Sequence, residues 1–200
     1  MRHLFAVDID GVLYDVIEHT RQFVKDKYNK IVPVSSITST NMAYFTDDEE
    51  INRDLINQLS DSHFYDSMKP IDCAWEALNL LRTMGPVIAI TKRKLKMLNV
   101  TTCTLVRDFG DLIISNKGPN TLYFYNDGPD RARRLGVTTM MEDSFEMAKK
   151  YAKKGILTYH VGGLFGTGGR QYFSAWLRSV KDVLEAAKDV KHIYEGAPIA

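Results

Sequence analysis

The stretch Phe5-Ala6-Val7-Asp8-Ile9-Asp10-Gly11-Val12-Leu13-Tyr14 joins a short apolar run to two carboxylates and a glycine. Leu4 to Val7 lacks polar alternation, which predicts a strand buried on both faces of a parallel sheet. Side chains alternate along an extended backbone, so Asp8 and Asp10 point the same way. Ligands of open α/β sheets bind at the carboxyl ends of strands, where this pair lies.

Two neighbouring carboxylates repel each other unless a cation or a proton lies between them. A divalent ion such as Mg²⁺, held by oxygen ligands and by substrate phosphate, would meet this need. Gly11 allows a tight turn directly after the pair. The alternative is that Asp8 and Asp10 only end the strand and begin a turn, because Asp before Gly is common in turns.

The 200 residues suit one domain, or one domain with a modest insertion. The net charge of +1 supplies no strongly basic field, so neither nucleic acid nor a membrane is expected as a partner. No apolar stretch reaches the roughly 18 residues of a membrane span, and no signal peptide precedes the first strand. Cys73 and Cys103 lack metal or redox spacing. We therefore expect a soluble, cytoplasmic protein with free thiols.

Strand-like and helix-like segments alternate along the rest of the chain. The apolar runs that predict further strands are Val87–Ile90, Leu112–Ser115, Val137–Met141 and Ile156–Tyr159, with Thr121–Tyr125 as a short additional candidate. This alternation predicts an α/β fold, a three-layer doubly wound parallel sheet with right-handed crossovers. Helical spacing from Phe173 to Ala187 predicts a final helix. From Asp189 onward we expect a loosely held tail.

A long, mainly helical detour separates the first two predicted strands. Apolar spacing predicts one helix up to about Tyr28 and another from Ile51 to Leu59. A single crossover between parallel strands does not need this much chain. We therefore expect residues 14–68 to form a small helical cap inserted over the strand ends, and residues 1–13 and 69–200 to form the core domain.

Polar side chains follow several of the predicted strands at the point where each strand ends. After Asp8 and Asp10 come Thr91, Asn116-Lys117 and Glu142-Asp143. Strands of one parallel sheet point the same way, so these groups can converge on one site. The prediction of a site depends on this convergence, because each short motif alone has little specificity.

The order and the residue types resemble the haloacid dehalogenase superfamily of phosphotransferases. The first motif is Asp8-Ile9-Asp10-Gly11-Val12, the second is Thr91 after an apolar strand, and the fourth is Glu142-Asp143-Ser144. The resemblance extends from Met1 to about Ala187, and the helical detour resembles that superfamily's cap in its first insertion position. Within the superfamily, the chain most resembles the 5′(3′)-deoxyribonucleotidase-like branch.

The resemblance implies a phosphomonoester hydrolase that works through an aspartyl-phosphate. Asp8 would be the nucleophile, and Asp10 would protonate the leaving oxygen and then deprotonate water. Mg²⁺ would be held by Asp8, the Asp10 backbone carbonyl and Asp143. The Thr91 hydroxyl would donate to a phosphoryl oxygen. Glu142 would support these ligands rather than bind the metal.

The third motif of the superfamily requires a cation beside the phosphoryl group. Lys117 fits this role best, as a catalytic and substrate-binding residue. Arg131 and Arg133 are alternatives with a planar donor geometry. Lys92 and Arg93 follow Thr91 and are further candidates for binding phosphate, although both also fit exposed positions in the first turn of a helix.

The expected substrate is a small phosphomonoester, and the resemblance favours a nucleoside monophosphate. Two other substrates of a phosphatase of this superfamily stay open, namely a sugar phosphate and a nucleic-acid 3′-phosphate. A weakly catalytic nucleotide-binding module is the third alternative, because the third motif is incomplete. The sequence leaves the oligomeric state open.

Overall fold

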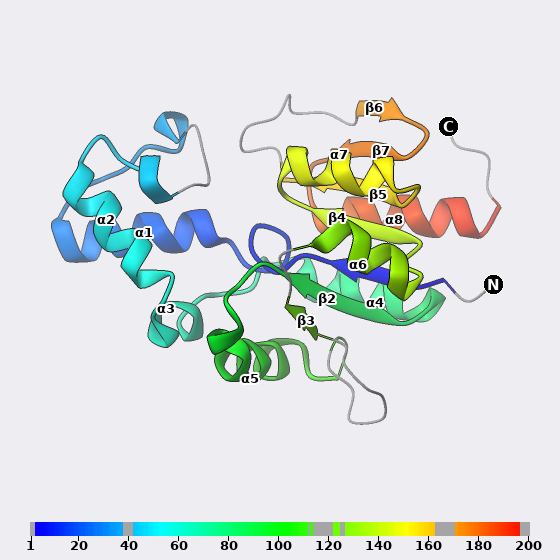
Figure 1. The fold of residues 1–200 in the computed structure, drawn as a ribbon, viewed down its shortest axis with the longest axis horizontal. Helices are drawn as coiled ribbons and strands as arrows, with labels where there is room; N and C mark the ends of the chain where they lie inside the picture. The colour runs from blue at the N-terminus through cyan, green and yellow to red at the C-terminus, as the bar shows by residue number, and fades with distance from the viewer. Residues whose placement is uncertain are drawn as a thin grey trace.

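The computed structural model describes residues 3–37, 42–111, 113, 122–124, 127–162 and 171–196. Within these residues the chain forms a three-layer α/β fold around one twisted sheet (Figure 1). The strands are β1 (Phe5–Val7), β2 (Val87–Thr91), β3 (Leu122–Phe124), β4 (Thr139–Glu142), β5 (Leu157–Val161), β6 (Gln171–Ser174) and β7 (Leu177–Val180). The predicted fold class is therefore confirmed.

The strand order is β3-β2-β1-β4-β5-β7-β6, with β1 near the centre. Every neighbouring pair is parallel except β6 and β7, which are antiparallel. The register places Val7 opposite Ala89 on β2 and opposite Met141 on β4. Since the three strands end side by side, the residues that follow them meet at one edge of the sheet.

Helices cover both faces of the sheet. They are α4 (Ala74–Met84), α5 (Leu98–Phe109), α6 (Gly128–Leu135), α7 (Phe145–Lys153) and α8 (Val183–Tyr194), with the 3₁₀ turn η3 (Leu95–Met97) before α5. Phe5 and Val7 belong to a core that includes α4 and α8 residues, whereas Ala6 belongs to a second core with α6 and α7 residues. The alternation of side chains along β1 explains this division, because both faces of the strand are buried.

The segment between β1 and β2 forms a separate group of helices beyond the carboxyl ends of the parallel strands (Figure 1). Its elements are α1 (Val16–Tyr28), η1 (Val34–Ser36), η2 (Met42–Tyr44), α2 (Glu49–Gln58) and α3 (Ser62–Asp66). The two connections to the core lie together, because Tyr14 and Pro70 form an antiparallel bridge and the Ile71 N–H donates to the Leu13 carbonyl at 2.9 Å. In the part of the chain that the structure describes, no helix has the length and apolar character to cross a membrane.

The strand predicted at Leu112–Ser115 lies mostly outside the described residues. Ile113 is buried in a turn, and the other three positions lie outside the described residues. The strand that pairs with β2 is β3, within the shorter candidate Thr121–Tyr125. Lys117 also lies outside the described residues.

The prediction of one helix from Phe173 to Ala187 was wrong. The first half of this segment forms the β6–β7 hairpin, and α8 begins only at Val183. Apolar residues at Leu177 and Val180 satisfy helical spacing, but β7 is buried along its length between β5 and β6. Tertiary pairing with β5 therefore overrides the local pattern.

The expectation of a loose tail from Asp189 was also wrong for the described residues, because α8 continues to Tyr194. Asp189 is only 3% exposed, accepts a hydrogen bond from the Tyr159 hydroxyl at 2.8 Å and pairs with Arg178 on β7. Burial, followed by this hydrogen bond, raises the pKa of Tyr159. The buried ion pair joins α8 to β7, and the hydrogen bond from Tyr159 joins α8 to β5.

Replacement of Asp189 by Ala should lower the free energy of unfolding by about 3–5 kcal/mol, because it leaves a buried guanidinium without its carboxylate. Denaturant unfolding measures this change. The matched control is Lys191→Ala on the same helix, which removes only an exposed pair with Glu195 and should change stability by about 0.5 kcal/mol or less. Equal effects of the two variants would contradict a structural role for the buried pair.

Candidate active site

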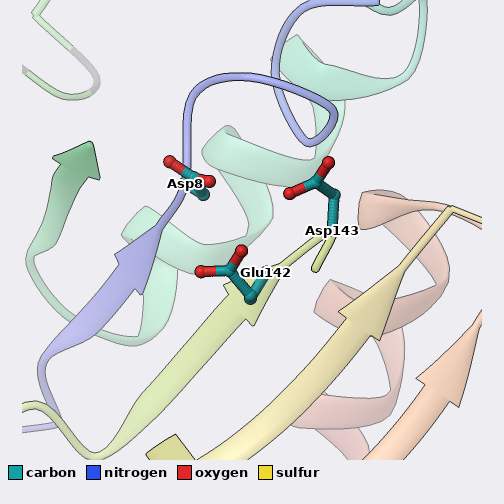
Figure 2. A group of neighbouring side chains, drawn as sticks. All are labelled: Asp8, Glu142 and Asp143. Atoms are coloured by element: carbon teal, nitrogen blue, oxygen red, sulfur yellow. The ribbon is translucent and has the colours of Figure 1, made fainter. Parts of the chain in front are cut away.

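Three carboxylates meet where β1 and β4 end. Asp8 follows β1, Glu142 is the last residue of β4, and Asp143 follows it. Figure 2 shows the three side chains grouped at and just beyond the ends of β1 and β4, and oxygen atoms from all three lie within 4.8 Å of one another. The Asp8 N–H donates to the Met141 carbonyl at 2.9 Å, which continues the pairing of the strands up to the cluster. The parallel register therefore brings Asp8 and Asp143 together, although 135 residues separate them in the chain.

Backbone groups hold the carboxylates in place. The Ile9 N–H donates to Asp8 Oδ1 at 2.8 Å, and the Ser144 N–H donates to Glu142 Oε1 at 3.1 Å. Gly11 has φ +80°, and a Cβ atom there would lie 2.3 Å from Asp143 Oδ2. Only glycine fits this position, because the backbone must turn in the left-handed region while Asp143 approaches it closely.

Burial and mutual repulsion raise the pKa of all three carboxyl groups. Burial is the main cause for Asp8, and the charges of Glu142, Asp143 and Asp10 add to it. Burial followed by the charge of Asp143 raises the pKa of Glu142 to about 8. Burial followed by the charge of Asp10 raises the pKa of Asp143 to about 6. The cluster thus has more negative charge than its buried surroundings can compensate.

The donor set suits a hard divalent cation. Carboxylate oxygens are the ligands that Mg²⁺ and Ca²⁺ prefer, and a cation would offset the repulsion that raises these pKa values. Glu142 is 1% exposed and contributes an oxygen to the group, so it is a third possible ligand that the sequence analysis placed only in a supporting role. The side chain of Asp10 is not part of this group.

Asp10 instead forms an ion pair with Arg93. Arg93 Nη2 lies 2.6 Å from Asp10 Oδ1, and Nε lies 3.0 Å from Oδ2. Arg93 is 7% exposed, so the prediction of an exposed residue in a first helical turn was wrong for it. A partner 83 positions away in the chain supplies the reason, since a buried guanidinium requires a counter-charge. No local pattern around Arg93 indicates this partner.

The residues after β2 face the same edge of the sheet. Thr91 is the last residue of β2 and is 1% exposed, and its Oγ1 accepts a hydrogen bond from the Arg93 N–H at 3.1 Å. Lys92 is exposed, and its charge opposes the rise in the pKa of Glu142 and Asp143. Lys92 therefore supplies positive charge next to the carboxylates.

The other cations considered for the third motif are placed differently. Arg131 and Arg133 are exposed residues of α6, the helix that follows β3. Lys117 lies outside the described residues, so the choice of the third-motif cation stays a prediction.

Residues 2–107 match the family described as 5′ nucleotidase, deoxy (pyrimidine), cytosolic type C protein (NT5C). This chain belongs to that family. The match covers more than half of the chain and includes Asp8, Asp10 and Thr91. The nucleotidase family assigns the chain to the phosphatases of the haloacid dehalogenase superfamily, and the predicted class of enzyme, a phosphoric monoester hydrolase acting on a small phosphate-bearing molecule, is confirmed at that level.

Solved structures of the haloacid dehalogenase superfamily share the fold of this chain. A family hydrolase from Deinococcus radiodurans, solved with bound phosphate and sodium, is 17% identical with a TM-score of 0.53, covering 80% of each chain. A haloacid dehalogenase-like hydrolase from Streptococcus pneumoniae is 12% identical with a TM-score of 0.58, covering 94% of this chain and 98% of the other. One from Xanthomonas campestris is 12% identical with a TM-score of 0.58, covering 97% and 96%. Comparison with curated proteins found no match.

The carboxylate cluster should make stability depend on pH. Because the pKa values of Glu142 and Asp143 are raised, the folded protein binds more protons than the unfolded chain between about pH 4 and pH 8. Stability in EDTA should therefore fall as the pH rises from about 5 to about 8, and Glu142→Gln should flatten this decline. Thermal unfolding across this range measures it. Excess Mg²⁺ should raise the melting temperature more at the alkaline end, and a melting temperature in EDTA that does not change with pH would contradict the electrostatic argument.

Gly11→Ala should abolish the stabilisation by Mg²⁺, because the added Cβ would displace the Asp143 carboxylate. The matched control is Gly136→Ala, which has nearly the same backbone strain at φ +78° but no atom within 4 Å of the added Cβ. Thermal shift on addition of Mg²⁺ compares the two. A retained Mg²⁺ response in Gly11→Ala would show that Asp143 is not needed for binding.

Proposed function

We propose that this protein is a Mg²⁺-dependent nucleotidase that hydrolyses phosphomonoesters through an aspartyl-phosphate on Asp8. The observation that carries the proposal is the meeting of Asp8 with Glu142 and Asp143 at the end of β1. A nucleophile and an acidic cluster that could hold a cation lie there at one edge of the sheet. Family membership supports the hydrolase chemistry, and the raised pKa values support the need for a cation.

The Asp8 carboxylate, the Asp10 backbone carbonyl and Asp143 would hold the ion, with Glu142 adding negative charge. When bound, Mg²⁺ would neutralise phosphate and carboxylate charge and draw electron density from the phosphoryl group. The neutralisation lets an anionic nucleophile approach an anionic substrate.

The reaction has two displacements at phosphorus. An Asp8 oxygen forms a bond to phosphorus while the ester bond breaks, and Asp10 donates a proton to the leaving oxygen. Asp10 then removes a proton from a water molecule that attacks the same phosphorus, which releases inorganic phosphate and restores Asp8. We propose that the Thr91 hydroxyl and the Lys92 ammonium bind phosphoryl oxygens, and that Lys117 is the third-motif cation.

A nucleoside monophosphate is the proposed substrate, because the matched family is described as acting on deoxy pyrimidine nucleotides. We also propose that residues 14–68 act as a cap over the site, with residues 1–13 and 69–200 as the core domain. The position of α1, α2 and α3 beyond the strand ends supports this division (Figure 1). The family description as cytosolic supports a cytoplasmic location.

A panel of phosphomonoesters tests the substrate class. Release of inorganic phosphate should be fastest from deoxynucleoside monophosphates in Mg²⁺ and should stop in EDTA. Faster release from sugar phosphates or from oligonucleotide 3′-phosphates would reassign the substrate. Tight nucleotide binding without turnover would instead indicate a binding module.

Replacement of Asp8 by Asn should lower turnover by roughly 10³-fold or more, the scale seen when an enzyme loses its covalent nucleophile. The matched control is Asp48→Asn, which retains an N-cap residue at the start of α2 and should leave turnover unchanged. Mass spectrometry of the quenched enzyme should detect a phosphorylated species in the wild type only. Wild-type turnover in Asp8→Asn would refute the assigned nucleophile.

A further inference from the structure

The Arg93 guanidinium holds both oxygens of Asp10 at once. Its Nη2 and Nε atoms approach Oδ1 and Oδ2 at 2.6 and 3.0 Å. A two-point contact of this kind fixes the plane of the carboxylate as well as its position, which a single hydrogen bond does not. The Arg93 side chain is 2% exposed, so solvent does not compete for the contact.

Arg93 is itself fixed by residues from two other elements. Its guanidinium lies 4.1 Å from the centre of the Tyr65 ring on α3, and Nη1 donates to Thr101 Oγ1 on α5 at 3.2 Å. The charge is buried, and a buried charge is stable only while its partners remain in place. Movement of α3 would therefore change the environment of the group that orients Asp10.

Other contacts between the core and residues in or just before α3 differ in kind. Arg107 donates to the Asp66 carbonyl at 2.7 Å but is about half exposed, and Lys94 donates to Ser60 Oγ at 3.1 Å in solvent. Exposed contacts such as these are worth little, and they do not involve Asp8, Asp10, Glu142 or Asp143. Among these contacts, the one through Arg93 reaches a residue of the proposed reaction.

We propose that Arg93 is a positioning residue that aims the Asp10 carboxyl group at the leaving oxygen, and that Tyr65 transmits the position of α3 to Asp10 through Arg93. The inference rests on the proposed function, in which Asp10 is the acid and base. Through these contacts, the helical segment between β1 and β2 would affect the chemical step as well as access to the site.

The ion pair leaves Asp10 able to exchange a proton. A carboxylate has about four lone-pair positions, and a bidentate guanidinium uses one on each oxygen. The Asp10 side chain is 28% exposed, so one edge faces outward from the contact. Arg93 stays protonated throughout, since guanidinium does not lose its proton in proteins. Arg93 therefore orients Asp10 without taking part in the proton transfer.

Two substrates with different leaving groups distinguish a loss of Asp10 positioning from a general loss of active enzyme. A nucleoside alkoxide is a poor leaving group and needs a proton from Asp10, whereas p-nitrophenolate leaves as a stable anion. Loss of the acid should therefore slow a nucleoside monophosphate far more than p-nitrophenyl phosphate. The ratio of kcat/KM for the two substrates reports this difference. It does not depend on the fraction of folded enzyme in the sample, because both substrates meet the same preparation.

The test compares this ratio in the wild type, Asp10→Asn, Arg93→Lys and Arg93→Met, all with Mg²⁺. Asp10→Asn should lower the ratio by roughly 10²-fold or more, the usual contribution of an acid catalyst. Arg93→Lys keeps the charge but loses the planar fork, and it should lower the ratio by about 10- to 10²-fold, as expected for a misplaced catalytic group. Arg93→Met should lower it at least as much.

The role of Tyr65 is tested by a matched pair of variants. Tyr65→Phe keeps the ring over Arg93 and should retain the wild-type ratio, whereas Tyr65→Leu removes the ring and should lower the ratio in the direction of Arg93→Lys. Lys94→Ala removes a different contact with the helical segment and should not change the ratio.

The outcomes separate the inference from the function on which it rests. A low ratio in Asp10→Asn with a wild-type ratio in both Arg93 variants would overturn the positioning role alone. An increased kcat/KM for the nucleotide in Arg93→Lys would also overturn it, because Arg93 would then restrain Asp10. Full activity of Asp8→Asn, or a wild-type ratio in Asp10→Asn, would refute the proposed function instead.

Discussion

Repulsion among Asp8, Glu142 and Asp143 is the constraint on which the candidate site depends. Three carboxylates within 4.8 Å, two of them at the ends of paired strands, are held closer than their charges favour. The surrounding core maintains this arrangement, because β1 is buried on both faces and packed between β2 and β4. The stability of the packed sheet therefore offsets the repulsion among these carboxylates, and a cation can neutralise their negative charge.

The chain places positive charge around this cluster in two different ways. Lys92 is exposed and affects Glu142 and Asp143 through space, whereas Arg93 is buried and contacts Asp10 directly. The two residues are neighbours directly after β2. Two adjacent residues at the end of one strand thus differ in exposure and in the carboxylates that they affect.

Much of the fold was predictable, because buried parallel strands have long apolar runs. The runs that became β1, β2, β4 and β5 each end at a polar residue or close to one, and the shared direction of the strands predicted where those residues meet. The β6–β7 hairpin was not predictable in the same way, since Leu177 and Val180 have the spacing of a helical face, and β7 is buried on both faces and so shows no alternation in the sequence. The role of Arg93 was hidden for another reason. Its partner is distant in sequence, and an arginine after a strand is usually exposed. Whether Glu142 can be a metal ligand depends on the distance between the ends of β1 and β4. The order of residues in the sequence does not give this distance.

The bridge between Tyr14 and Pro70 has a consequence for how proteins of this kind can diversify. The helical segment leaves and rejoins the core at adjacent points, so its ends span almost the same gap whatever lies between them. A segment with adjoining ends can be lengthened, shortened or exchanged without stretching the sheet, as in a domain insertion. Substrate preference and bond-breaking chemistry can then evolve as separable modules within one polypeptide, linked through the few side chains, Arg93 among them, that cross from one to the other.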